Sequence, residues 1–379
     1  MKKIGIITVQ KAPENYGACL QCYALWKFIK NQGHHCEMID LMRPWSPEYI
    51  ESKRFKEKKK KAKIPFYKKI IRNIFHPKAS VGSVPIENKN FQEFNALMDY
   101  SETYYSVDGL YDNPPVYDVY VAGSDQIWNP LMPFINEPYF LTFVPKGKKK
   151  ISYASSFAVK EIPKGRWTAY SDWLVDFDAI SVRERSGLDI VKNCFGRDAS
   201  IVADPTMLLA RNEWEKLLVK PQLEEKYLFV YTLQYNQQIV DKAISFAEDK
   251  GLVVYVIVSS TTGVKPEQKR GVHFITTAGP KEWLGFIYSA EYVITDSFHG
   301  SVFSFLFSKK LLTVCTNKKV SERLTTLFGS FSLSSNLIDV EQFKLMNNLD
   351  RANYPFNDVE KAIDNLRNKS ASFLVNALK

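Results

Sequence analysis

Short apolar runs alternate with helical patterns along the chain. An Ile-rich run over 3–9 predicts a strand, apolar residues spaced three and four apart predict a helix ending near Gly33, and 35–41 predicts a second strand. This β-α-β pattern recurs, which indicates parallel strands with helices on both faces of the sheet. The other predicted strands span 117–121, 151–155, 177–182, 200–202, 227–231, 252–258, 273–276, 292–295 and 311–314.

The pattern divides the chain into two parts. A turn at Asp204-Pro205-Thr206 and a charged stretch over 211–225 interrupt the alternation. We therefore predict an α/β fold of two doubly wound, Rossmann-like domains, 1–215 and 216–379, that face a cleft. The last helix, 358–378, is a candidate to pack back on the first domain. Ligands of such sheets bind beyond the carboxyl ends of the strands.

The positive charge is concentrated in one segment. The chain carries a net charge of +10, and residues 51–72, with eleven Lys or Arg and two Glu, account for +9 of it. We treat 51–76 as a basic insertion, and its favoured interpretation is a solvated, partly helical segment. The alternative is peripheral contact of 53–72 with an anionic membrane. Nucleic acid is not an expected partner, because no known binding motif accompanies the charge.

Several classes of protein are disfavoured. No run of about 18 apolar residues is present, and the apolar stretch after Met1 is too short for a secretory signal, so we expect a cytoplasmic protein, free or peripheral at the inner face of the membrane. The chain has no G-x-G-x-x-G or Walker segment, and its histidines are scattered, so we expect no cofactor and no metal. Cys19 and Cys22 have C-x-x-C spacing in an apolar helical pattern, which favours packing and leaves a redox role open.

One strand end combines anion binding with a titratable group. The apolar run 292–295 leads into Asp296 and Ser297, either of which can cap a following helix. Ser297, His299 and Gly300 would then surround a helix N-terminus, where unpaired N–H groups and the positive dipole end favour an anion. A bound phosphate or carboxylate would hold a proton on His299. The alternative is a cap beside an incidental surface histidine.

A second strand end is typical of a sugar site. The run 117–121 is followed by Gly123 to Asn129, which includes Asp125 and Trp128. An indole ring can stack on a pyranose while polar groups bind its hydroxyls. The alternative is a core tryptophan beside a turn.

Arg183 follows a third strand, 177–182. Its guanidinium can bind a carboxylate or phosphate through two parallel hydrogen bonds. A surface ion pair between Arg183 and Glu184 is the alternative.

Six segments in order along the chain resemble the polysaccharide pyruvyl transferase family. They are Asn15-Tyr16-Gly17-Ala18 with Leu20-Gln21, Gly123-Ser124-Asp125-Gln126-Ile127-Trp128-Asn129, Tyr153-Ala154-Ser155-Ser156-Phe157, Ser181-Val182-Arg183-Glu184, Asp204-Pro205-Thr206 and Asp296-Ser297-Phe298-His299-Gly300. The resemblance implies a GT-B-like fold, phosphoenolpyruvate as donor and a saccharide hydroxyl pair as acceptor. The product would be a pyruvate ketal in bacterial surface polysaccharides such as capsule or exopolysaccharide.

The resemblance also implies roles for single residues. Arg183 and His299 match the arginine and histidine that the family ties to donor binding and catalysis, so we expect His299 as general acid and Arg183 as anion clamp. Donor-binding candidates are Ser297, Gly300, Lys318, Lys319 and Arg323. Acceptor-binding candidates are Asn15, Tyr16, Gly17, Ser124, Asp125, Trp128 and Asn129. Asp125 and Asp296 are candidate bases.

Other functions stay open beside this one. A GT-B-type glycosyltransferase that uses a nucleotide sugar would need similar anion sites. A non-catalytic carbohydrate-binding protein of an envelope-assembly complex is the second alternative. The acceptor, free or lipid-linked, its hydroxyls, the ketal stereochemistry and the oligomeric state are not predicted.

Overall fold

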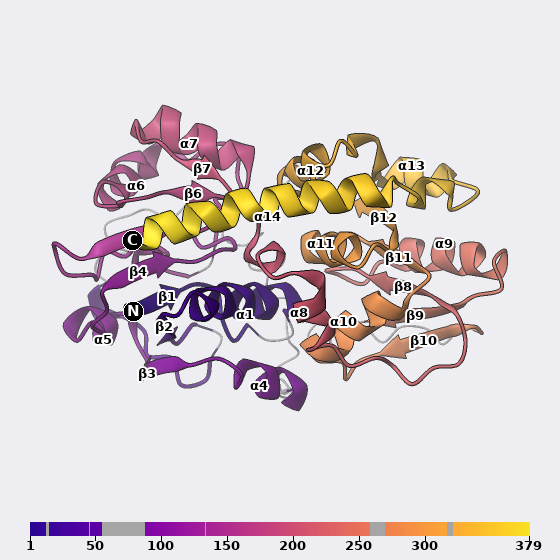
Figure 1. The fold of residues 1–379 in the computed structure, drawn as a ribbon, viewed down its shortest axis with the longest axis horizontal. Coiled ribbons are helices and arrows are strands. Elements are labelled where there is room, and N and C mark those ends of the chain that lie inside the picture. Colours follow the sequence, from indigo (N-terminus) through magenta and orange to yellow (C-terminus); the bar gives the residue numbers. More distant parts are fainter. Residues whose placement is uncertain (13–14, 45, 55–87, 133, 258–269, 317–320) are drawn as a thin grey trace.

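Two parallel β-sheets lie end to end, and one long helix runs across both of them (Figure 1). The computed structural model describes residues 1–12, 15–44, 46–54, 88–132, 134–257, 270–316 and 321–379. Most of the basic insertion and both Lys318 and Lys319 therefore lie outside the described residues. Within the described part of the chain, no helix is long and apolar enough to cross a membrane.

The first sheet has the strand order β3-β2-β1-β4-β5. Its strands are β1 (Lys3–Ile7), β2 (His35–Leu41), β3 (Tyr100–Tyr104), β4 (Val119–Ala122) and β5 (Lys149–Ser152). The short pair β6 (Ser181–Val182) and β7 (Ser200–Ile201) continues the sheet beyond β5 through single bridges. The helices of this half are α1 (Tyr16–Asn31), α4 (Lys89–Asn95), α5 (Val107–Asp112), α6 (Trp167–Leu174), α7 (Arg185–Phe195) and α8 (Arg211–Glu215).

The second sheet has the order β10-β9-β8-β11-β12-β13. Its strands are β8 (Tyr227–Tyr231), β9 (Val253–Ile257), β10 (Val272–Ile275), β11 (Tyr292–Thr295), β12 (Lys310–Cys315) and β13 (Leu337–Asp339). Its helices are α9 (Gln237–Glu248), α10 (Pro280–Ser289), α11 (Phe298–Leu306), α12 (Ser321–Ser330), α13 (Val340–Leu345) and α14 (Phe356–Leu378). Helices cover both faces, so the central strands are nearly all apolar and buried, as in the sequence YLFVY of β8. The predicted α/β fold with two parallel sheets is confirmed.

Some elements differ from the predicted ones for physical reasons. β3 was not predicted, because its sequence YSETY is polar and half-exposed at the edge of the sheet. β13 is only three residues long and gives no periodic signal. The charged stretch 211–225, which interrupts the predicted alternation of strands and helices, begins with the short helix α8. The predicted strand 177–182 is ordered as a strand only at Ser181–Val182.

The two halves share one continuous hydrophobic core. Tyr16 at the start of α1 stacks on Trp283 of α10, with ring centroids 5.3 Å apart, and its hydroxyl donates to the carbonyl oxygen of Ala278. Buried side chains from both sheets join this cluster. An apolar contact of this extent favours a fixed arrangement of the two halves.

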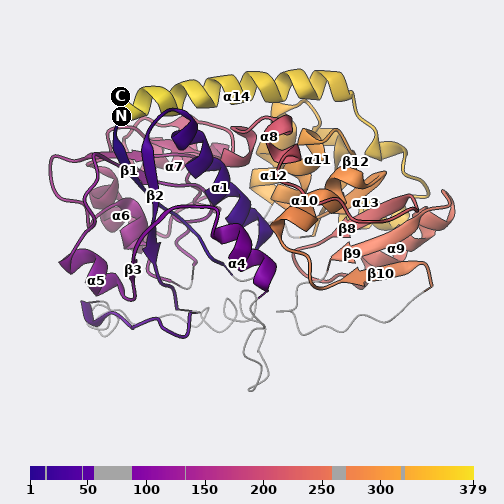
Figure 2. The same ribbon diagram turned by 60° about the horizontal axis from the view of Figure 1, so that its bottom comes forward.

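The last helix attaches to the first sheet as well as to the second. Ser370 of α14 accepts a hydrogen bond from the backbone N–H of Ala203 at 2.9 Å, and Arg367 donates to the carbonyl oxygen of Met207 at 2.8 Å. Farther along, Leu374 packs among the apolar residues beneath β1 and β4. Figure 2 shows α14 lying over both halves.

Candidate active site

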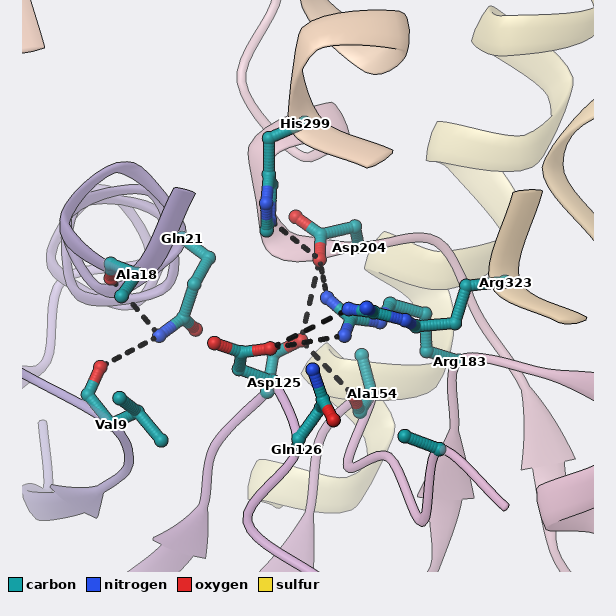
Figure 3. A network of polar contacts seen from close by, with 12 residues as sticks. Val9, Ala18, Gln21, Asp125, Gln126, Ala154, Arg183, Asp204, His299 and Arg323 are labelled. Carbon is teal, nitrogen blue, oxygen red and sulfur yellow. Dashed lines mark hydrogen bonds and ion pairs between the residues drawn. The ribbon is translucent and has the colours of Figure 1, made fainter. Parts of the chain in front are cut away.

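Two carboxylates, two guanidinium groups and one imidazole meet between the two sheets (Figure 3). Asp125 follows β4, Arg183 follows β6 and Asp204 follows β7, so all three come from carboxyl ends in the first half. His299 lies in the first turn of α11 and Arg323 in α12, both in the second half. All five residues are buried. The structure therefore brings together the predicted Arg183, His299, Arg323 and Asp125.

Asp204 is the centre of this cluster. Its Oδ2 accepts a hydrogen bond from Arg183 Nη1 at 2.5 Å and lies 3.6 Å from His299 Nε2. Its Oδ1 accepts hydrogen bonds from the backbone N–H and the hydroxyl of Thr206. Burial opposes ionisation, but His299, Arg183 and Thr206 outweigh it and hold the pKa of Asp204 far below its usual range. Asp204 is thus a fixed anion that links residues of opposite halves.

The two arginines lie against one aromatic ring. The guanidinium carbon of Arg183 lies 4.8 Å from the ring centre of Phe298, and that of Arg323 lies 5.7 Å from it. Burial favours loss of the Arg183 proton, but Asp204 and Asp125 raise its pKa above the usual value. Burial and the charge of Arg183 lower the pKa of Arg323 to about 10. Both side chains are therefore cationic at neutral pH.

Asp125 joins the two arginines through one oxygen. Its Oδ1 lies 3.3 Å from Arg183 Nη2 and 3.8 Å from Arg323 Nη1. Burial opposes ionisation, but Arg183, Arg323 and His299 hold the pKa of Asp125 below its usual value. Its backbone has a φ of 69°, in the left-handed region that few residues other than Gly and Asn adopt readily. Backbone strain of this kind is common at functional sites.

His299 presents an unpaired nitrogen to this cluster. Ser297 caps α11 by accepting a hydrogen bond from the N–H of Gly300 at 3.2 Å, which fixes the first turn. The His299 residue is only 8% exposed, and its Nε2 has no hydrogen-bond partner among the described residues. A buried polar atom without a partner is costly, so a ligand that supplies one would be stabilised.

Gly17 makes the position of His299 feasible. A Cβ atom at Gly17 would lie 2.0 Å from His299 Nδ1, which no side chain tolerates. Only glycine at this point of α1 allows the imidazole ring to lie against the helix. Gly17, predicted as an acceptor residue, is instead placed against the candidate acid.

Replacing Gly17 by Ala is expected to push the His299 ring out of place. A displacement of about 1 Å at a reacting group can lower turnover about 100-fold, and we expect a loss of that order in the phosphate release that the family resemblance implies. Gly165→Ala is the control, because a Cβ there meets nothing within 4 Å. Unchanged turnover in Gly17→Ala, measured as phosphate release, would contradict this placement of His299.

Several other predicted acceptor residues have structural partners. Asn15 caps α1 by accepting a hydrogen bond from the N–H of Ala18, and Tyr16 lies in the contact between the two halves. Ser124 donates to the carbonyl oxygen of Ala154 and lies 3.4 Å from Asp204. The amide of Asn129 is bound within its own turn.

Trp128 lies in the core of the first half and not at a sugar-binding surface. Its exposed fraction is 0%, and its ring stacks on Phe140 with centroids 5.0 Å apart. Its indole N–H donates to the carbonyl oxygen of Tyr139 at 2.9 Å. With no free ring face, Trp128 cannot stack on a saccharide, so the acceptor assignment needs this correction.

Asp296 is turned away from the five-residue cluster. Its carboxylate accepts hydrogen bonds from the N–H of Leu233 at 2.7 Å and the hydroxyl of Thr316 at 3.0 Å. Burial raises its pKa to about 6 despite these hydrogen bonds. Asp296 thus connects the loops after β8 and β12. Of the two candidate bases, only Asp125 contacts the arginines.

A small cavity adjoins the arginines between the two halves. It has a volume of about 50 Å³, with Arg183, Asp204 and Arg323 at its polar side and Met207, Leu327 and Leu366 among its apolar residues. This is room for a few water molecules. Among the described residues, no group of three or more His, Cys, Asp or Glu side chains is placed to hold a metal ion.

The fold and the position of this site define a GT-B-like α/β protein. The chain is similar over its full length to the glycotransferase of kitacinnamycin, with 12% identity, a TM-score of 0.54 and coverage of 100% of this chain and 99% of that one. The N-terminal domain of Candida albicans trehalose-6-phosphate phosphatase gives 10% identity, a TM-score of 0.52 and coverage of 99% and 96%. A putative UDP-N-acetylglucosamine 2-epimerase from Listeria monocytogenes gives 10% identity, a TM-score of 0.50 and coverage of 100% and 95%. At such identities these likenesses concern the fold alone.

The sequence family is narrower than the fold. Residues 15–317 match the family described as polysaccharide pyruvyl transferase, and because they make up most of the chain, the protein belongs to that family. No curated protein sequence matches the chain. The match includes Asp125, Arg183, Asp204 and His299, whereas Arg323 lies beyond it.

Two residues of the cluster had no predicted role in the site. Asp204 looked like part of a turn, although a carboxylate directly after a predicted strand was the available signal. Phe298 belongs to the family-like segment 296–300 but had no predicted role, and nothing in the sequence indicates that two arginines lie near its ring.

Proposed function

We propose that this protein transfers the pyruvyl group of phosphoenolpyruvate to a pair of saccharide hydroxyls and forms a pyruvate ketal in the synthesis of a bacterial surface polysaccharide. The observation that carries the proposal is the position of His299, whose Nε2 lies 3.6 Å from Asp204 beside two guanidinium groups. The cluster thus combines a proton donor with cations suited to an anionic donor. Membership of the family supports the same substrates.

The reaction places definite demands on the site. The methylene carbon of phosphoenolpyruvate must gain a proton, which leaves a cationic centre beside the carboxylate. One acceptor hydroxyl attacks that centre, phosphate leaves, and the second hydroxyl closes the ring. The two hydroxyl protons finally reside on the new methyl group and on the phosphate, so atoms and charges balance.

His299 serves as the general acid in this scheme. Its Nε2 lies 3.6 Å from the carboxylate of Asp204, which orients the imidazole ring. Arg183 and Arg323 bind the donor's carboxylate or phosphate and stabilise the negative charge that develops on the leaving phosphate. Asp125 removes the proton of the attacking hydroxyl, and Asp296 holds the surrounding loops.

A nucleotide-sugar glycosyltransferase is the second candidate function. The observation that favours it is the structural likeness to the glycotransferase of kitacinnamycin. A sugar diphosphate is also an anion that two guanidinium groups can bind. The two functions differ in their donor.

Thermal unfolding with each donor separates the two candidates. A ligand at 100 times its Kd stabilises the folded state by about 2.7 kcal/mol, so we expect phosphoenolpyruvate to raise the Tm by a few degrees. UDP- and GDP-sugars should give no such rise. A shift with a nucleotide sugar and none with phosphoenolpyruvate would overturn the proposal. After a shift with phosphoenolpyruvate, phosphate release in an acceptor screen would identify the saccharide.

A further inference from the structure

The two arginines that the proposed function assigns to the donor are already occupied by carboxylates of the protein. Arg183 comes from the first half and Arg323 from the second, and both are directed at Oδ1 of Asp125. Arg183 also donates to Asp204. Because Asp125 and Asp204 already bind the guanidinium groups, an anionic donor must replace one of these carboxylates to gain strong hydrogen bonds.

Asp125 is the more easily displaced carboxylate. The Asp204 side chain is fully buried and held by Thr206 as well as by Arg183 at 2.5 Å. The Asp125 side chain is 11% exposed, lies 3.3 Å and 3.8 Å from the two arginines, and has no other hydrogen bond among the described residues. Nε of Arg183 also lacks a partner among those residues, which leaves a donor for an incoming anion.

We propose that Asp125 occupies the anion position between Arg183 and Arg323 in the free enzyme, and that the donor replaces it there and thereby releases it as the base. The inference rests on the proposed function for the identity of the donor. In the transfer step, His299 gives a proton to the methylene carbon, an acceptor oxygen bonds to C2 of the donor, and the proton of that hydroxyl passes to Asp125. The bond from C2 to the phosphate oxygen then breaks, and that proton leaves with the phosphate.

The exchange explains how one carboxylate can be both an ion-pair partner and a base. While it lies between the arginines, Asp125 is a weak base, because Arg183, Arg323 and His299 keep its pKa low despite burial. Once the donor takes these cations, burial is no longer offset and the carboxylate binds a proton more readily. The acceptor is therefore activated only after the donor has bound.

The backbone and the side chain of Asp125 are held by different contacts. Asp125 has a φ of 69°, and its carbonyl oxygen accepts hydrogen bonds from the N–H groups of Ile127 and Ser156. The backbone is thus fixed from both neighbouring loops, whereas the side chain is held only by the arginines. The carboxylate can change rotamer without a change in the loop.

Replacing Asp125 by Asn tests the exchange. We expect the variant to bind phosphoenolpyruvate more tightly and yet to be inactive in transfer. Loss of the competing charge should lower the Kd for phosphoenolpyruvate about ten- to a hundredfold, the range of a charge-assisted hydrogen bond, while transfer to the acceptor is lost. Asn tolerates a left-handed backbone. Asp125→Gly is a second variant that suits a positive φ and also removes the carboxylate.

The control is Glu37→Gln, which changes the net charge equally at a partly buried carboxylate near the start of β2. Glu37 accepts a hydrogen bond from the hydroxyl of Tyr117 and lies 3.7 Å from Lys3, so its variant should leave the Kd for phosphoenolpyruvate unchanged. Calorimetry with phosphoenolpyruvate and with inorganic phosphate gives the readout on folded protein.

The outcomes separate the exchange from the function on which it rests. Tighter phosphate binding in both Asp125 variants, without binding of phosphoenolpyruvate to any form, would support the exchange and overturn the donor assignment. Unchanged or weaker binding of both ligands in the Asp125 variants would overturn the exchange, because Asp125 would then be only a structural ion-pair partner. An equal gain in Glu37→Gln would overturn it too, because the effect would be one of net charge.

Discussion

Replacing His299 by Gln is expected to lower the turnover of phosphoenolpyruvate by about two to four orders of magnitude, the usual contribution of a general acid. Glutamine fills a similar volume and still donates a hydrogen bond toward Asp204, but it cannot give a proton to the methylene carbon. Donor binding should therefore change far less than turnover. Stopped assays of phosphate release, together with calorimetric Kd values, measure the two effects separately.

A second histidine provides the control for this prediction. His273 lies on β10, stacks on Tyr255 and is not part of the buried cluster, so His273→Gln should leave phosphate release unchanged. A normal rate in His299→Gln would remove the general-acid assignment. A parallel loss of binding and turnover would instead assign His299 to donor binding.

Replacing Arg183 by Ala should impair both stability and donor binding. The change leaves the buried carboxylates of Asp125 and Asp204 without their shared cation, and breaking a buried ion pair in this way typically costs about 3–5 kcal/mol. Urea unfolding should show this loss, and calorimetry should show a large decrease in affinity for phosphoenolpyruvate. Arg183→Lys keeps the charge and gives a folded comparison.

Arg211→Ala is the control for Arg183→Ala, because it removes an arginine at the surface. Arg211 pairs with Glu215 on the half-exposed face of α8, where an ion pair contributes at most about 1 kcal/mol. Retained affinity for phosphoenolpyruvate in Arg183→Ala would remove the anion-clamp role, even if the stability fell as expected. A stability loss no larger than that of Arg211→Ala would contradict the burial of the ion-pair cluster.

The central strands could be predicted from the sequence because burial on both faces makes them apolar. The bounds 35–41, 227–231 and 292–295 agree with β2, β8 and β11 residue for residue. The edge strand β3 could not be predicted in this way, since its three central residues are polar and its pairing with β2 is a tertiary contact. Local sequence carries little information about such a strand.

The sequence predicts where the site lies better than it predicts which side chains contact each other there. Polar residues after parallel strands meet at one edge of a sheet, and Arg183 and Asp125 do so here. The sequence shows that Arg183 is cationic but not that Asp125 and Asp204 neutralise it, because these residues are distant along the chain. The burial of Trp128 likewise depends on packing against Phe140, which no local pattern indicates.

The continuous apolar contact between the halves limits how far the two halves can move apart. With Tyr16 stacked on Trp283 and α14 fastened to both sheets, a wide hinge motion would expose much hydrophobic surface to water at each turnover. If a few side chains rotate and the ion pairs rearrange around the entering ligand, the two halves need not separate and that cost is avoided. The catalytic cycle of this enzyme would then be governed by a local electrostatic rearrangement within a rigid frame.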